Sequence, residues 1–170
     1  MELRKRQRID LSEVPSLQEA RNLCLKLLAQ RERSRTELLS KLAASGVDES
    51  VARHVVEELA AEALQSDERY AEVYVRSSHG KGRGPQRLRH ELRARGIGGE
   101  QMESVLAEQD WDQALAAVHA KKFGLAKPKS PKEYSARVRF LMQRGFALGA
   151  IQSLLRRLGS EDEFPNTEDD

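Results

Sequence analysis

Three glycines recur at nearly constant spacing along the 170-residue chain, and each follows a helix-like segment. Gly46, Gly96 and Gly145 lie 50 and 49 residues apart. A leucine precedes each glycine by four residues, and apolar residues follow it at the first, sixth, ninth and tenth positions. A glycine in this position commonly ends a helix, because it adopts the left-handed conformation that other residues avoid. The register therefore predicts three tandem copies of one helical unit.

Composition favours helices in all three copies. Ala, Glu, Lys, Leu and Arg make up about half of the chain, a proportion typical of helical proteins. The strand formers Val, Ile and Thr are scarce. Hydrophobic residues account for 39% and charged residues for 33%, which suits a thin core. We therefore expect an all-α protein of three tandem three-helix repeats, helix-turn-helix-like units that stack into an elongated, curved array.

Helix start signals divide each copy into three helices. Ser16–Glu19, Ser34–Glu37 and Ser130–Glu133 have the spacing of capping boxes, in which a serine and a glutamate satisfy exposed backbone amides. The signals predict helices near residues 16–30, 34–45, 48–64, 67–78, 85–95, 99–108, 110–123, 131–144 and 147–158. The expected organisation is a basic flexible N-terminus over 1–15, repeats over 16–65, 66–109 and 110–159, and an acidic disordered tail over 160–170.

No motif in the sequence indicates catalysis. The single Cys24 excludes an internal disulfide, and its apolar neighbours predict a buried thiol. The four histidines lack the spacing of metal ligands. The glycine-rich run 80–85 lacks the spacing of a phosphate loop and predicts a flexible basic linker. We expect no enzymatic activity, no catalytic residue, no metal and no cofactor, and the absence of a secretory signal or membrane-length apolar segment predicts a cytoplasmic protein.

The aromatic residues leave two interpretations open. Tyr70 and Tyr74 lie four residues apart on one predicted helix, a spacing that suits core packing and also base stacking beside a basic residue. Trp111 opens another predicted helix and is expected to pack in the core or to anchor one repeat on the next. The second repeat has helix-turn-helix spacing, but its last helix is acidic, which argues against reading of a DNA major groove.

Charge is arranged in alternating blocks, although the formal net charge is only +2. Residues 76–95 contain seven Lys or Arg side chains and a single acidic residue, and residues 119–145 are similarly basic. Residues 48–68 and 99–112 are acidic. Solvated helix faces alone can give some of this pattern, but blocks of this length more often mark a surface that meets a charged partner.

The central part of the sequence resembles the RecX family. The resemblance covers roughly residues 18–158 and is carried by Ser34–Leu38, Ser66–Ala71, Tyr74–Ser77, Gly82–Leu88, Glu91–Leu92, Arg95–Ile97, Lys121–Gly124, Phe140–Leu141 and Arg144–Phe146. It implies a bacterial regulator of the RecA recombinase, built of tandem three-helix repeats and active in DNA repair, recombination and the SOS response. Such proteins act on the RecA–single-stranded DNA filament and restrain its strand exchange, ATP hydrolysis and co-protease activity.

The expected partner is therefore the RecA filament, and single- or double-stranded DNA is a further candidate. No membrane is expected as a partner, and the protein is expected to be a monomer. A protein that binds DNA directly and a helical scaffold remain the alternatives. The candidate partner-binding residues are the basic side chains Arg76, Lys81, Arg83, Arg87, Arg89, Lys121, Lys122, Lys127, Lys129 and Lys132.

Overall fold

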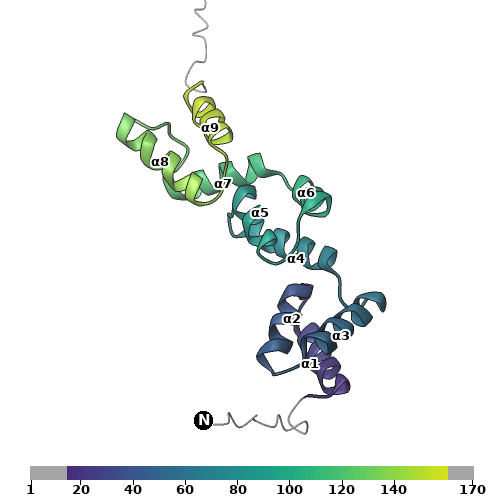
Figure 1. Ribbon diagram of the computed structural model, residues 1–170. Coiled ribbons are helices and arrows are strands. Elements are labelled where there is room, and N and C mark those ends of the chain that lie inside the picture. The colour runs from purple at the N-terminus through teal and green to yellow at the C-terminus, as the bar shows by residue number, and fades with distance from the viewer. Residues whose placement is uncertain (1–14, 161–170) are drawn as a thin grey trace, which may run out of the picture. The chain divides into compact units, whose positions relative to one another are not determined.

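The computed structural model describes residues 15–160 and contains nine helices and no strand within them (Figure 1). The all-α prediction is confirmed. The flexible segment expected over 1–15 and the acidic tail expected over 160–170 lie outside the described residues, apart from Pro15 and Ser160. The helices are α1 (Leu17–Gln30), α2 (Arg35–Ala44), α3 (Glu49–Ala61), α4 (Asp67–Gly80), α5 (Pro85–Arg93), α6 (Gly99–Ala107), α7 (Trp111–Phe123), α8 (Pro131–Gln143) and α9 (Leu148–Ser160).

The capping boxes at Ser16 and Ser34 are formed as predicted, and the box at Ser130 is formed only in half. The Ser130 side chain accepts a hydrogen bond from the Glu133 amide, but the Glu133 carboxylate accepts from the Lys129 amide at 2.9 Å. Helix α3 ends at Ala61, three residues earlier than predicted. Ala63 adopts a left-handed φ of 56° there and closes the helix with a turn that the sequence did not signal.

All three recurring glycines end helices in the left-handed conformation, with φ values of 77°, 78° and 94°. In each turn, the amide after the glycine donates to the carbonyl of the leucine four residues before it, at 3.0–3.2 Å. This is the hydrogen bond of a Schellman motif. The leucines and the aligned apolar positions are all buried, with at most 7% of their surface exposed. The repeat read from the sequence is therefore a repeat of turn geometry and of core positions.

The chain divides between Tyr70 and Ala71 into two compact units. In the first unit, α1, α2 and α3 pack around a core that includes Leu38, Leu42 and Leu59. Cys24 belongs to this core and is fully buried, as predicted. Burial raises the pKa of the Cys24 thiol to about 11, so the thiol stays protonated and unreactive at neutral pH.

The second unit contains the second repeat from Ala71 onward and the third repeat. Leu115, Leu141 and Phe146 are central to the core formed by α7, α8 and α9. Trp111 donates its indole N–H to the Leu106 carbonyl at 2.7 Å and meets the His79 ring edge-to-face at 5.1 Å between centroids. The tryptophan thus joins the start of α7 to α4 and α6, which matches the anchor role expected for it.

The glycine-rich run 80–85 is packed against the third repeat, and the prediction of a flexible linker is wrong. The Gly84 amide donates to the Arg144 carbonyl at 2.7 Å, and the Gln86 amide donates to the Gly145 carbonyl at 3.0 Å. A Cβ atom at Gly84 would overlap the Gly145 carbonyl group. Glycine is needed here because two backbones touch, a requirement that local sequence does not reveal.

Candidate partner-binding surface

The five candidate residues of the segment 76–95 lie on three consecutive elements. Arg76 is on α4, Lys81 and Arg83 are in the turn that follows, and Arg87 and Arg89 are on α5. Arg76, Lys81 and Arg87 are exposed, whereas Arg83 and Arg89 are half-buried. Leu88 and Leu92 hold α5 in place, because both are fully buried.

Glu91 forms ion pairs with two of these arginines. Arg87 Nε donates to Glu91 Oε1 at 2.9 Å, and Arg83 Nη1 lies 3.3 Å from Glu91 Oε2. Burial alone would raise the pKa of Glu91, but hydrogen bonds from Tyr74 and Arg87 hold that pKa below its ordinary value. Glu91 is therefore ionised at neutral pH, and Arg83 and Arg87 already have a carboxylate partner inside the protein.

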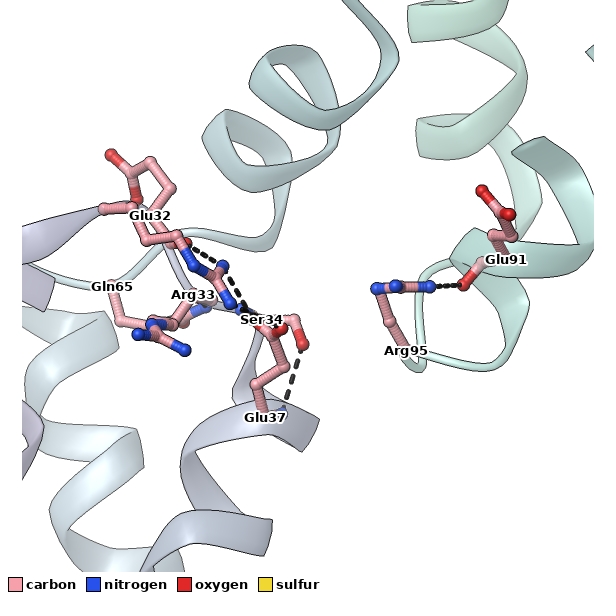
Figure 2. A network of polar contacts seen from close by, with 8 residues as sticks. Glu32, Arg33, Ser34, Glu37, Gln65, Glu91 and Arg95 are labelled. Atoms are coloured by element: carbon pink, nitrogen blue, oxygen red, sulfur yellow. Dashed lines mark hydrogen bonds and ion pairs between the residues drawn. The ribbon is translucent and has the colours of Figure 1, made fainter. Parts of the chain in front are cut away.

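Tyr74 is covered by the same network. Its hydroxyl donates to Glu91 Oε2 at 2.5 Å, and the Arg95 guanidinium lies 4.6 Å from the centre of its ring. Arg95 also donates to the Glu91 backbone carbonyl at 2.6 Å, a contact visible in Figure 2. Tyr70 has only 4% of its surface exposed. The structure thus places Tyr70 in the core and engages the partly buried Tyr74 with Glu91 and Arg95.

Arg89 has a carboxylate partner on α6. Its guanidinium reaches Glu103 with two nitrogen atoms, at 2.8–3.1 Å. Such forked pairs are the stronger kind of surface ion pair. The acidic segment 99–112 therefore neutralises part of the basic segment 76–95. Within the part of the chain that the structure describes, Arg76 and Lys81 are the two candidates of this segment whose side chains have no such partner.

The candidate lysines of the segment 119–145 are all exposed. Lys121 and Lys122 form the last turn of α7, where the positive charge is favoured by the helix dipole. Lys127 and Lys129 lie in the connection to α8, and Lys132 lies in the first turn of α8. The structure brings Lys81 of the first basic segment to a common hollow with Lys121 and Lys122 of the second.

Arg137 is a structural residue that the sequence analysis missed. It is 7% exposed, donates to the Ala126 carbonyl at 2.6 Å and lies 3.2 Å from His119 Nε2. It thereby holds the connection between α7 and α8 against the core. Burial and, secondarily, the Arg137 charge lower the pKa of His119, so the imidazole is neutral at pH 7. The i,i+4 spacing of Arg137 to the buried Leu141 was the signal that placed it on the inner face of α8.

A second polar cluster that the sequence did not predict lies in the first unit, around the loop between α1 and α2 (Figure 2). Gln65 donates to the Arg33 carbonyl at 3.1 Å, and Arg69 donates to Glu32 at 2.8 Å. Glu32, Arg33 and Gln65 each also have a buried side-chain atom without a hydrogen-bond partner among the described residues. These groups fix the loop against the segment that leads into α4, and they do not form an exposed binding surface.

The fold and the charges define a class of protein. The described helices carry buried apolar stripes, helix caps and exposed cationic side chains. Among the described residues there is no group of three or more His, Cys, Asp or Glu side chains placed to hold a metal ion. None of the helices from Leu17 to Ser160 is both long enough and apolar enough to cross a membrane. These features are those of an all-helical repeat protein whose basic side chains gather in two segments of the chain.

Comparison with known families identifies that class more closely. Models of the first, second and third three-helix domains of RecX match residues 20–59, 66–106 and 108–155. The regulatory protein RecX of Halorhodospira halophila is 38% identical over 156 residues, which cover 90% of this chain and 97% of that protein. The corresponding protein of Chromohalobacter salexigens is 41% identical over 77% of this chain and 88% of that protein. The chain therefore belongs to the RecX family.

Solved structures agree on the fold. The crystal structure of RecX from Lactobacillus salivarius superposes with a TM-score of 0.71, at 22% identity, over 85% of this chain and 97% of that chain. A second structure, of a regulatory protein RecX, has a TM-score of 0.70 at 20% identity and covers 86% of this chain and 72% of that chain. The prediction of three tandem three-helix repeats is confirmed.

Proposed function

We propose that this protein binds the RecA–single-stranded DNA filament and inhibits its recombinase, ATPase and co-protease activities. The observation that carries the proposal is the succession of three RecX three-helix domains along the chain. The protein acts in this proposal as a monomer in the bacterial cytoplasm, by binding and without chemistry of its own. Its contribution to DNA repair, recombination and the SOS response is regulatory.

The basic side chains without a carboxylate partner are the proposed contacts. An ion pair within the protein must be broken before its arginine can bind an external anion, and this lowers the gain from binding. Among the described residues, Lys81, Lys121 and Lys122 have no carboxylate partner and also line one hollow, so they are the first contacts to test. The remaining candidates are Arg76, Arg83, Arg87, Arg89, Lys127, Lys129 and Lys132.

Co-sedimentation tests the proposal directly. RecA filaments are assembled on single-stranded DNA with a slowly hydrolysed ATP analogue, and the protein is added to filaments, to RecA alone and to DNA alone. We expect the protein to sediment with filaments at concentrations at which it does not bind free RecA. RecA ATPase activity on single-stranded DNA is expected to fall over the same concentration range.

Two results would contradict the proposal. A protein that binds naked DNA as tightly as filaments, with a steep dependence on salt, acts on DNA directly. A protein that binds neither is a helical scaffold of another kind. Each result removes the RecA filament as the partner and favours one of the two alternatives.

A further inference from the structure

A cationic hollow lies within the second unit, between the end of α4, the end of α7 and the end of α8. Its volume is about 610 Å³, within the range of about 300–1,000 Å³ that is usual for ligand sites. Four cationic side chains line it: Lys81, Lys121, Lys122 and Arg144. They come from three separate elements, so the fold, and no single run of sequence, brings them together.

The charges around this hollow are not balanced by the described residues that line it. No Asp or Glu is among the described residues that line it. Lys81 and Lys121 have no side-chain partner among the residues that the structure describes. This differs from the neighbouring α5, whose arginines pair with Glu91 and Glu103. Like charges gathered without a counter-charge repel one another, and a bound anion would remove that cost.

Phe140 gives the hollow an aromatic wall. Lys122 Nζ and the Arg144 guanidinium lie 5.9 Å and 5.2 Å from the centre of its ring. Arg144 Nη1 is also held by the Lys81 carbonyl at 3.3 Å. Val118 adds an aliphatic surface beside the ring. The hollow therefore combines cations that can bind phosphates with an apolar wall that can contact a base or a sugar.

We propose that this hollow binds the phosphate backbone of single-stranded nucleic acid. The combination of a cationic groove with an aromatic side chain is the one that single strands require, because each nucleotide presents an anion next to a flat apolar ring. An acidic peptide would satisfy the cations but would leave the aromatic wall without a matching group. The inference rests on the proposed function, since it assigns the DNA-facing contact of a protein that acts on a DNA filament.

Fluorescence anisotropy with a labelled oligothymidylate tests this site. The test variant is K121E/K122E, and the matched control is K26E/K41E, which reverses two exposed lysines of the first unit. We expect the test variant to bind the oligonucleotide about tenfold or more weakly than the wild type at low salt, with a salt slope reduced by about 1.4. The control is expected to stay within about twofold of the wild type. The affinity of K121Q/K122Q for the oligonucleotide is expected to lie between those of the wild type and K121E/K122E. Far-UV circular dichroism checks that the helices persist in each variant.

Three outcomes would overturn the assignment. The first is equal weakening in test variant and control, which indicates a diffuse charge effect. The second is unchanged binding in K121E/K122E. The third is an oligoglutamate peptide that binds the wild type as tightly as the oligonucleotide, which assigns the hollow to an acidic protein surface. RecA filament co-sedimentation is read separately, so that loss of the hollow's DNA contact is distinguished from failure of the proposed function.

Discussion

The basic segments 76–95 and 119–145 are similar in sequence and differ in what their charges meet. In the first segment, Arg87 pairs with Glu91 and Arg89 pairs with Glu103. In the second, Lys121 and Lys122 extend from the last turn of α7 toward a hollow that no described carboxylate lines. Positive charge on α5 is therefore largely engaged in ion pairs within the fold, whereas Lys121 and Lys122 on α7 have no carboxylate partner among the described residues.

We therefore expect a block of charge to serve as a binding surface only where the fold leaves its side chains without a counter-charge. Arg89 and Glu103 are 14 residues apart in the sequence and belong to blocks of opposite sign. The turn at Gly96 folds α6 back toward α5 and brings these blocks together. Net charge over a window of sequence does not contain that information.

The largest effect is expected from a substitution that breaks the backbone contact between the turn at Gly145 and the start of α5. Gly145→Val would place a side chain onto the Arg87 backbone, and φ there is 94°. We expect the free energy of unfolding to fall by about 3 kcal/mol or more, because overlap and left-handed strain add. Gly46→Val is the control, because nothing lies within 4 Å of the added Cβ atom; there we expect about 1–2 kcal/mol from strain alone. Chemical denaturation followed by circular dichroism measures both, and equal losses would contradict the close packing at Gly145.

A smaller effect is expected from a substitution that leaves arginines of the first segment without a carboxylate partner, like the lysines of the second. Glu91→Gln keeps an acceptor for the Tyr74 hydroxyl and removes the charge that holds Arg83 and Arg87. We expect a loss of about 0.5–1 kcal/mol in the free energy of unfolding, since water screens these partly exposed pairs. Oligothymidylate binding is expected to rise a few-fold as two arginines become available, and unchanged or weaker binding would contradict the neutralising role of Glu91.

The difference in stability between the wild type and Glu91→Gln is expected to depend on pH. The pKa of Glu91 is held below its ordinary value of 4.5 in the folded protein. Its contribution to stability is therefore present above pH 4.5 and is lost as the pH falls through the lowered folded value. Denaturation curves of wild type and Glu91→Gln are expected to differ at pH 7 and to converge in acid. A stability difference that does not shrink in acid would show that the charge is not its source.

The smallest expected effect concerns the buried imidazole beneath the second segment. The folded pKa of His119 is below its ordinary value of 6.5, so the unfolded chain takes up a proton first as the pH falls. The free energy of unfolding is expected to decrease as the pH drops below 6.5. His119→Gln retains an acceptor for Arg137 and is expected to abolish the decrease in the free energy of unfolding that begins below pH 6.5. The further decrease at lower pH, which comes from carboxylates, is expected to remain. Parallel pH profiles for the two proteins would contradict a buried, neutral His119.

Much of the fold could be predicted from local signals. The positions of Ser16, Ser34 and Asp48 predict helix starts that the structure contains, and the recurring glycines predict both the turns and the buried positions around them. These features depend on residues within one or two helical turns of one another. A single sequence with strong caps and strong periodicity therefore specifies them well.

The candidate site could be predicted only in part. The sequence predicts Lys81, Lys121 and Lys122 as contacts because they are basic, but their meeting at one hollow depends on contacts between residues more than 35 positions apart. Arg144 completes the hollow and has no such signal in the sequence, because its role follows from the packing of the turn at Gly145 on Gly84. Backbone contacts between distant glycines leave no local pattern, and for the same reason the sequence of the run 80–85 is typical of a linker.

Inhibition of the RecA ATPase on single-stranded DNA by two matched variants tests the central claim most directly. K121Q/K122Q and R83Q/R87Q each remove two positive charges. The first pair has no carboxylate partner among the described residues, and the second pair contacts Glu91. We expect the wild type to inhibit the RecA ATPase. The half-inhibitory concentration is expected to be about tenfold higher for K121Q/K122Q and to stay within about threefold of the wild type for R83Q/R87Q. Equal shifts for both variants, or a larger shift for R83Q/R87Q, would contradict the assignment of the binding surface, and a wild-type protein that leaves the ATPase unchanged would contradict the function.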